Sequence, residues 1–535
     1  MSTPADAAIA AEIAREVARR RTFAIISHPD AGKTTLTEKT LLYAGAIELA
    51  GAVRGRKSQR AVVSDWMEIE RERGISITSA ALEFDLWDKR VVLLDTPGHK
   101  DFSEDTYRTL LAVDSVVMVL DAAKGIETQT RKLFEVCRRQ HLPILTFINK
   151  CDLPGQDPLD LLDEIERELG LSAVPMNWPI GTGQEFRGIY DLAQREVLLY
   201  ERVVRGERRA HVEVASPSDP ALRDLIGERQ QSELLDAIEL LTGAGVHFER
   251  DEYLAARQTP VYFGSALANF GLEPFLKALV AMAPPPQPRP AEPHVVDPAA
   301  TDFSGFVFKI QANMNPRHRD RIAFLRVCSG VLTRDMTVKH ARLPGTVRLS
   351  SPQRFFGRER ETVDVAYPGD VVGLVNPGRF RIGDTVYTGE RVEFPAIPHF
   401  PAEHFATLRL RDVRYKQFDD GLRQLEEEGL MQVFFPEHGP REPILGVVGE
   451  LQFDVIATRL KNEYNVSCEA HRLNYVAARW VLADEQVVAA MNIPLQGVQR
   501  ATDRHGTPVL LFASEWDLDY TQKQNEQVTL SPTAA

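Results

Sequence analysis

The stretch SHPDAGKT, residues Ser27 to Thr34, decides the fold of this 535-residue chain. The apolar run RTFAIIS leads into it, and the segment KTTLTEKTLLYAG, which is typical of a helix, follows it. At such a strand-to-helix turn, backbone N–H groups converge on an anion and the helix N-terminus adds positive potential. We therefore expect a phosphate-binding loop in which Lys33 reaches the phosphates and Thr34 binds Mg²⁺. The general motif begins with glycine rather than serine, so an ordinary glycine-containing turn is the alternative for the segment alone.

Two further motifs follow predicted strands in the same way. The sequence DTPGH (Asp95–His99) comes after RVVLL, and NKCD (Asn149–Asp152) comes after PILTFI. Ligands of open parallel sheets bind at the edge where the carboxyl ends of the strands meet. The order and placement of the three segments therefore predict one site at one edge of an α/β sheet.

The DTPGH segment is expected to act on the terminal phosphate. Asp95 can hold a magnesium-bound water, and the N–H of Gly98 can reach a γ-phosphate. One residue further, the His99 imidazole can orient the attacking water, so His99 is the predicted catalytic residue. The alternatives are a plain Asp-Pro-Gly turn at a strand end and a histidine that satisfies a buried polar group.

The NKCD segment is expected to read the base. Guanine presents two adjacent donors, N1–H and the 2-amino group, and the Asp152 carboxylate can accept from both, whereas adenine lacks that pair. The stem of Lys150 can cover the ring face, and the small residues of GSAL, at 264–267, let backbone N–H groups approach the guanine oxygen. A solvated loop is the alternative. The residues predicted to bind GTP are Ser27, His28, Pro29, Asp30, Ala31, Gly32, Lys33, Thr34, Asp95, Thr96, Pro97, Gly98, His99, Asn149, Lys150, Cys151, Asp152, Ser265 and Ala266.

A polar segment without clear periodicity, residues 45–74, ends in RGISIT, residues 73–78. Long irregular segments inside a compact domain are usually functional or disordered. A hydroxyl group here could bind Mg²⁺ while the triphosphate is present and release it after hydrolysis. Ser76 is the predicted second metal ligand beside Thr34, and Thr78 is the weaker candidate. An ordinary strand start would need no such function.

Composition limits the classes of protein to consider. A chain of this length predicts about three domains, and no apolar run approaches the roughly 18 residues that span a membrane. The four cysteines are far apart without a CxxC pair, which predicts reduced thiols in a cytoplasmic protein. The net charge of −13 argues against indiscriminate nucleic-acid binding, so no DNA partner is expected. We expect a monomer.

The order of predicted elements divides the chain into domains. We expect an N-terminal helical extension at 1–20, a GTP-binding α/β domain with a mostly parallel sheet at 21–283, and an insertion in it at about 171–259. A proline-rich linker at 284–298 leads to an antiparallel β-barrel at 299–395. Residues 396–535 have the order β-α-β-β-α-β of a ferredoxin-like α+β domain, and the tail VTLSPTAA at 528–535 is expected to be disordered.

Two runs beyond the linker combine arginines with aromatic residues. They contain Arg317, Arg319, Arg321 and Arg326, and then Arg354, Arg358 and Arg360. Contact with structured RNA would use such residues, and solvated loop charge is the alternative.

With these motifs the chain resembles the translational GTPases, most closely the bacterial peptide chain release factor 3 family. The resemblance covers nearly the whole length and includes SDWMEIERERGISIT, DTPGHKDFSEDTYRTL, NWPIGTGQEFRGIYDL and LLFASEWDLDYTQ. The part DFSEDTYRTL discriminates best, because the translocase elongation factor differs after DTPGH. Ser27 is what this family shows at the start of the phosphate loop, whereas Ser76 stands where related GTPases usually have threonine.

The resemblance implies a ribosome-dependent GTPase that converts GTP to GDP with Mg²⁺ and promotes dissociation of class 1 release factors after peptide release. Its implied partners are the ribosome, both RNA and proteins, and those release factors, and no membrane. Two alternatives are kept. One is another ribosomal GTPase of the translocase type, although little sequence follows the third domain here. The other is a nucleotide-regulated binding switch in which hydrolysis is incidental.

Overall fold

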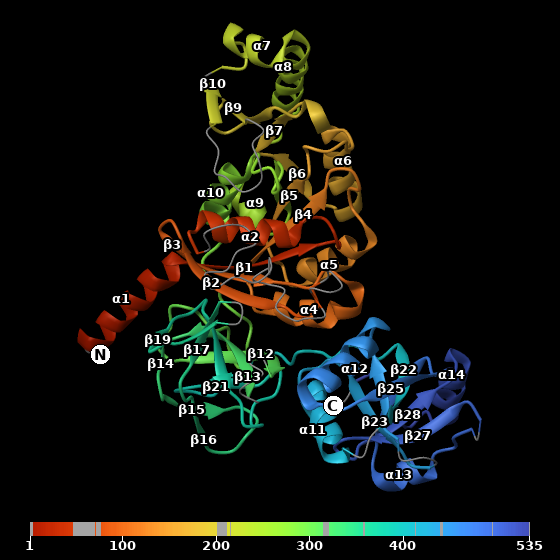
Figure 1. Cartoon of the computed structure of the whole chain (residues 1–535). Coiled ribbons are helices and arrows are strands. Elements are labelled where there is room, and N and C mark those ends of the chain that lie inside the picture. Colours follow the sequence, from red (N-terminus) through yellow and green to blue (C-terminus); the bar gives the residue numbers. More distant parts are fainter. Residues whose placement is uncertain are drawn as a thin grey trace.

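The computed structural model describes residues 4–46, 70, 76–200, 211–214, 216–313, 320–356, 359–411, 414–438, 442–494 and 496–533. Figure 1 shows an α/β part in the centre with a small layer above it, a β-barrel-like part below, and an α+β part at the lower right. This order confirms the predicted fold class. The exact domain boundaries stay predictions.

The central part is built on a sheet with the strand order β2-β3-β1-β4-β5-β11-β6. β1 lies in the middle and pairs in parallel with β3 and β4. Only the β2–β3 hairpin is antiparallel among these pairs. The strands are β1 (Arg20–Ser27), β2 (Ala80–Leu86), β3 (Lys89–Asp95), β4 (Ser115–Asp121), β5 (Ile144–Asn149), β6 (Ser172–Pro175) and β11 (Gln258–Phe263).

Alternating side chains of each strand enter two different cores. In β1, Ala24 and Ile26 pack on one face, and Phe23 and Ile25 pack on the other. The first face is covered by α4 (Ser103–Leu111), α5 (Thr128–Arg139) and α6 (Pro158–Leu169), and the second by α2 (Lys33–Tyr43) and α10 (Leu272–Met282). The sheet is therefore covered by helices on both faces, as its continuous apolar strands require. Helix α1 (Pro4–Arg19) precedes β1 and extends from the central part (Figure 1), and Tyr367 of the barrel-like part donates from its hydroxyl to Glu12 of this helix.

The insertion forms the small layer at the top of Figure 1. Its antiparallel sheet has the order β10-β9-β8-β7. The elements are β7 (Asn177–Ile180), β8 (Gly188–Asp191), β9 (Glu196–Tyr200), β10 (His211–Val214), α7 (Pro220–Ile226) and α8 (Glu228–Gly243). Helix α9 (Arg250–Leu254) lies in the central part, where it contacts β11 (Figure 1). β6, which the sequence analysis assigned to the insertion, instead pairs with β11 as the edge strand of the central sheet. A strand of four residues is too short for its periodicity to reveal this.

The barrel-like part is antiparallel and joins the central sheet. Its strands follow the order β16-β15-β21-β12-β13-β20-β17, and β17 pairs with β2. The strands are β12 (Ser304–Ala312), β13 (Arg321–Ser329), β14 (Leu332–Thr333), β15 (Thr337–His340), β16 (Thr346–Arg348), β17 (Gln353–Phe356), β18 (Glu359–Thr362), β19 (Val365–Ala366), β20 (Val371–Val375) and β21 (Thr385–Tyr387). Their inward side chains form a separate apolar core.

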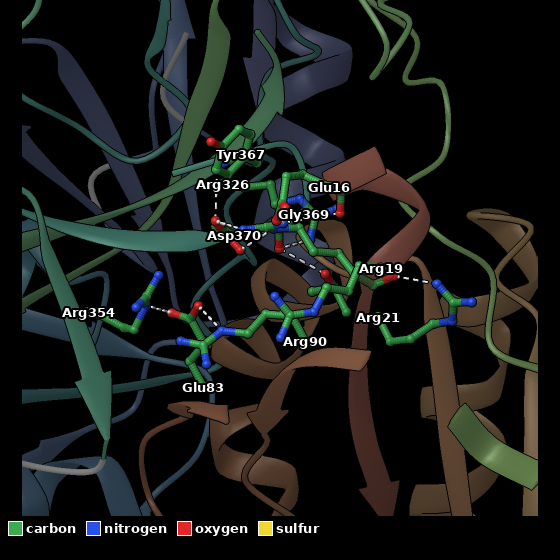
Figure 2. Close-up of polar contacts among 12 residues, drawn as sticks. Glu16, Arg19, Arg21, Glu83, Arg90, Arg326, Arg354, Tyr367, Gly369 and Asp370 are labelled. Carbon is green, nitrogen blue, oxygen red and sulfur yellow. Dashed lines mark hydrogen bonds and ion pairs between the residues drawn. The ribbon is translucent and has the colours of Figure 1, made fainter. Parts of the chain in front are cut away.

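Buried polar contacts fix this part to the central sheet (Figure 2). Arg20 Nε donates to Asp370 Oδ1 at 2.7 Å, and Thr22 Oγ1 donates to the carbonyl oxygen of Gly369 at 2.8 Å. On β2, the buried Glu83 lies between Arg90 and Arg354, the latter from β17. Burial raises the pKa of Glu83 to about 7, although both guanidinium groups lower it. The two parts are therefore joined by charged groups as well as by paired strands.

The C-terminal part contains the predicted ferredoxin-like layer. The order β25-β22-β24-β23 of its antiparallel sheet is continued by β27-β28-β26-β29. The elements are β22 (His404–Leu410), α11 (Tyr415–Glu427), β23 (Gln432–Pro436), β24 (Ile444–Val447), α12 (Leu451–Tyr464), β25 (Cys468–Leu473), β26 (Ala477–Leu482), α13 (Glu485–Ala490), β27 (Val498–Asp503), β28 (Pro508–Phe512), α14 (Glu515–Gln524) and β29 (Thr529–Ser531). The predicted disorder of 528–535 is wrong for β29, because this strand pairs with β26.

Two composition-based expectations can be compared with the structure. None of the four cysteines is joined in a disulfide bond, and burial raises the pKa of Cys151 to about 12, so this thiol is protonated at neutral pH. None of the helices in the described ranges is long and apolar enough to cross a membrane.

Candidate functional site

The predicted phosphate loop lies between the end of β1 at Ser27 and the start of α2 at Lys33. Gly32 has φ 98° and caps the helix in a left-handed conformation. A Cβ atom at this position would lie 2.2 Å from Nδ2 of Asn149. Glycine is therefore required both by the backbone conformation and by the close approach of the NKCD loop.

The DTPGH loop lies against the phosphate loop. Lys33 Nζ donates to Asp95 Oδ1 at 2.7 Å, and both side chains are buried. A Cβ atom on Gly98 would contact the backbone nitrogen of Pro29 at 3.4 Å. Thr96 Oγ1 donates to the Ile25 carbonyl oxygen at 2.7 Å, which fixes the start of the loop to β1. The structure thus brings these two predicted segments together.

Asn149 connects the NKCD loop to two other segments. Its Nδ2 donates to the Ala31 carbonyl oxygen at 2.8 Å, and its Oδ1 accepts from the Ala266 N–H at 2.9 Å. The buried side chain therefore ties the phosphate loop to the loop that holds Ser265 and Ala266. The N–H of Cys151 also donates to the carbonyl oxygen of Gly264 at 3.1 Å.

Lys150 crosses from the NKCD loop to the phosphate loop. Its Nζ donates to the Asp30 carbonyl oxygen at 2.5 Å and lies 2.8 Å from Asp121 Oδ2. Burial opposes ionisation of Asp121, but the bonds from Lys150 and the Ala123 N–H lower its pKa overall. Asp121 ends β4 and was missed by the sequence analysis, although it follows the apolar run SVVMVL in the same way as the other loops. The half-buried Asp152 follows in the same turn.

The donor set fits Mg²⁺. No group of three or more His, Cys, Asp and Glu side chains that could hold a metal occurs among the residues that the structure describes. Thr34 is half-buried in the first turn of α2, and Asp95 supplies a carboxylate beside Lys33. Mg²⁺ usually takes one or two protein oxygens and completes its shell with water and substrate phosphates, so a sparse oxygen set of this kind suits it.

His99 is held by its own loop. Its Nδ1 accepts from the Asp101 N–H at 3.3 Å, and the ring is about one third exposed. The same nitrogen also lies 3.3 Å from Oδ1 of Asp101. Asp101 Oδ2 accepts from the Leu451 N–H at 2.7 Å, at the start of α12. Asp101, two residues after His99, thus connects the predicted catalytic residue to the C-terminal part, a role that sequence analysis missed.

His28 has a partner from α5. Its Nε2 lies 3.0 Å from Oε2 of Glu127, the residue that precedes the first turn of α5. The ring of this predicted GTP-binding residue is therefore directed to Glu127, while its backbone remains in the phosphate loop.

The segment after Ser76 contacts α4 and the barrel-like part. The N–H of Ser79 donates to Asp105 Oδ2 at 2.7 Å, and Lys309 Nζ from β12 donates to the Ser79 carbonyl oxygen at 2.6 Å. Residues 73–75, and most of the polar segment at 45–74, lie outside the described residues. Ser76 itself is half-buried, and its metal role stays a prediction.

Four of the predicted RNA-contacting arginines lie among the described residues, and each of them pairs with a carboxylate of this chain. Arg326 is fully buried, and its Nη2 donates to Asp114 Oδ2 at 2.5 Å. Arg321, Arg354 and Arg360 form ion pairs with Glu427, Glu83 and Asp320 respectively. The prediction of RNA contact is wrong for Arg326, and the charge of the other three is shared with carboxylates. Arg317, Arg319 and Arg358 lie outside the described residues.

Family models cover most of the chain. The model of the elongation factor Tu GTP binding domain matches residues 18–285, and the model of elongation factor G domain 2 matches residues 302–389. The model of the class II release factor RF3 C-terminal domain matches residues 394–522. The first match contains all three loops of the site, which shows that the site belongs to a GTPase domain.

Proteins named peptide chain release factor 3 are similar over nearly the full chain. The protein of Synechococcus elongatus is 52% identical over 98% of this chain and 94% of its own length. That of Gloeobacter violaceus is 52% identical over 96% and 97%, and that of Symbiobacterium thermophilum is 51% identical over 98% and 99%.

A crystal structure of a Thermus thermophilus protein has the same fold, with a TM-score of 0.68 at 22% identity over 91% of this chain and 72% of that one. The three-loop site, the C-terminal family match and the full-length similarity lead to one assignment. The chain belongs to the peptide chain release factor 3 family of translational GTPases.

Proposed function

We propose that this chain is a ribosome-stimulated GTPase that promotes dissociation of class 1 release factors from the ribosome after peptide release. The observation that carries the proposal is the convergence of three loops through Lys33, Asp95 and Asn149 at one edge of the sheet. The names of the full-length relatives support the role in termination.

The phosphate loop would bind the triphosphate. Backbone N–H groups of the phosphate loop and the N-terminus of α2 would donate hydrogen bonds to the phosphate oxygens, and Lys33 would neutralise the β- and γ-phosphates. Lys33 is held at this place by its buried bond to Asp95. Mg²⁺, held by Thr34, by Ser76 and through water by Asp95, would supply further charge neutralisation when bound.

The opposite end of the site would select guanine. Asp152 would accept from N1–H and the 2-amino group, Lys150 would cover one ring face, and the N–H groups near Ser265 and Ala266 would approach the guanine oxygen. Asn149 holds the phosphate loop and the 264–267 loop at a fixed spacing. The base and the phosphates would then be bound by parts of one connected frame.

Hydrolysis would form a bond between water oxygen and the γ-phosphorus and break the bond between that phosphorus and the β–γ bridging oxygen. His99 would orient the water, and Asp101 would fix the ring orientation through its N–H. Positioning and charge stabilisation dominate such reactions. We propose that ribosomal RNA completes the site, which would make turnover slow without the ribosome.

Contacts of α4 and of the turn that precedes it would carry the nucleotide state to the C-terminal part. Arg108 Nη1 donates to the Glu428 carbonyl oxygen at 3.0 Å, and Asp101 binds the Leu451 N–H. These bonds start within the segment that follows the γ-phosphate contact. They also support the second candidate, a switch that works by nucleotide-dependent affinity.

The test combines two assays on the purified chain with ribosomes. GTP hydrolysis is measured with and without ribosomes, beside dissociation of a labelled class 1 release factor from termination complexes. The proposal expects ribosome stimulation of several orders of magnitude and release-factor dissociation that depends on GTP. Absence of either effect would contradict it. If many rounds of dissociation proceed equally with a non-hydrolysable analogue, the switch without required hydrolysis is correct instead.

A further inference from the structure

One exposed aromatic pair lies on α14, far along the chain from the nucleotide site. The exposed fraction is 67% for Trp516 and 39% for Tyr520. Their ring centroids are 5.1 Å apart and their planes are inclined by 15°, so the rings are stacked. The residues are four positions apart and therefore neighbours on one helix face.

The fold does not depend on this pair. The inner face of α14 is formed by Leu518, which packs against the adjacent core, and by Thr521, which is fully buried. The helix begins at Ser514, whose Oγ accepts from the Asp517 N–H at 3.2 Å. Trp516 and Tyr520 lie on the side opposite Leu518, since residues two positions apart in a helix are separated by about 200°. Large aromatic side chains left in water on a rigid element are typical of a binding surface.

Carboxylates border the pair. Glu515 and Asp519 are exposed and each precedes one aromatic residue by one position, so they form the adjoining row of the helix. Asp517 is engaged by the Ser514 hydroxyl at 2.6 Å. Lys523, in the last turn, is the cation of α14, so the described helix carries three carboxylates and one ammonium group.

The exposed aromatic pair and the neighbouring carboxylates together favour a cationic ligand over an anionic one. Nucleic acids also stack on aromatic platforms, but such platforms lie in basic grooves, and the carboxylates here would repel phosphates. A guanidinium group stacks flat on tryptophan or tyrosine and pairs with a neighbouring carboxylate through its N–H fork. Both features lie on adjoining rows of α14, within residues 515–520.

We propose that this face of α14 docks an arginine-bearing segment of a basic protein. One guanidinium lies on the Trp516–Tyr520 pair and donates to Glu515 or Asp519. The surface is separate from the nucleotide site, so the inference stands independently of the proposed function.

The test measures binding of a labelled peptide of alternating arginine and glycine to the full chain by fluorescence anisotropy. The variant Trp516→Ala/Tyr520→Ala is compared with Trp87→Ala, which removes another exposed tryptophan, 47% exposed, from the β2–β3 turn. The aromatic variant is expected to bind about tenfold more weakly, while Trp87→Ala binds like the unchanged chain. Unchanged binding by the aromatic variant would overturn the proposal.

Four further measurements distinguish the possible ligands and test the contribution of each chemical group. Trp516→Phe/Tyr520→Phe should bind the arginine peptide more tightly than the alanine variant does and nearly as tightly as the unchanged chain. Glu515→Gln/Asp519→Asn should bind the peptide more weakly, and this binding should depend less on salt. A lysine–glycine peptide should bind more weakly than the arginine peptide, because ammonium lacks the planar fork. Oligouridylate binding that exceeds peptide binding and is lost in the aromatic variant would show a nucleic-acid surface instead.

Discussion

Replacing Asn149 with alanine should weaken GTP binding far more than replacing another buried asparagine that makes two hydrogen bonds to the backbone. The matched change is Asn177→Ala. Asn177 Nδ2 donates to the Phe263 carbonyl oxygen at 3.0 Å, and its Oδ1 accepts from the Phe263 N–H at 2.7 Å. Both asparagines are buried, with exposed fractions of 2% for Asn149 and 0% for Asn177. Each therefore makes two buried bonds to backbone groups near one edge of the same sheet.

The expected losses of folding free energy follow from these hydrogen bonds. Removing one partner of a buried hydrogen bond costs about 1–3 kcal/mol, so each variant should lose about 2–6 kcal/mol of folding free energy. Of these two asparagines, only Asn149 donates to the Ala31 carbonyl oxygen in the phosphate loop. If that single bond orders the loop for the nucleotide, its loss of about 1–3 kcal/mol weakens GTP binding by roughly 5- to 150-fold.

The assay titrates each variant with a fluorescent GTP analogue, and urea unfolding of the same samples reports the stability loss. We expect similar stability losses in both variants and a selective loss of GTP affinity in Asn149→Ala. Equal affinity losses in both variants would show a general effect of destabilisation. Unchanged GTP binding by Asn149→Ala would refute the role assigned to the Asn149 side chain in ordering the phosphate loop.

Further changes test the remaining features. His99→Ala should leave GTP binding nearly unchanged and lower ribosome-stimulated hydrolysis by about a hundredfold or more, measured as phosphate release; unchanged stimulation would remove His99 from its role. The Glu83 carboxyl, with a folded pKa of about 7, stabilises the fold fully below its unfolded pKa and loses this contribution as pH rises through about 7. Relative to Glu83→Gln, the unchanged chain should therefore lose roughly 2 kcal/mol of stability between about pH 5 and pH 8, seen as a falling difference in Tm; a constant difference would contradict the raised pKa. Lys309→Met should remove the buried ammonium group that pairs with the half-buried Asp105 carboxylate and donates to Ser79, and should cost about 3 kcal/mol in urea unfolding, whereas no loss would show that these contacts add nothing.

Local sequence was enough to predict the parts of the molecule that depend on neighbouring residues. The three loops follow β1, β3 and β5 as expected. Each loop position was set by an apolar run and by the residues directly after it. The ferredoxin-like strand order followed from the succession of elements.

Features made by distant segments could not be predicted. The bond between Asp101 and the Leu451 N–H joins residues 350 positions apart, and Arg326 meets Asp114 across 212 positions. A basic run in the sequence gives no sign of such partners, which is why Arg326 was misassigned to an RNA surface. The short strands β6 and β29 were missed for a related reason, since their pairing partners rather than their own patterns define them.

The central claim is that the loops around Lys33, Asp95 and Asp152 bind a guanine nucleotide, and base exchange at Asp152 tests it most directly. Asp152→Asn should shift the preference from GTP toward XTP, because the amide can donate where the carboxylate accepts. The control is Asp157→Asn, which changes the exposed residue that caps α6 at the Leu159 N–H. In competition binding, the account predicts XTP preference for Asp152→Asn and GTP preference for Asp157→Asn. An Asp152→Asn variant that still prefers GTP as strongly as the unchanged chain would contradict it.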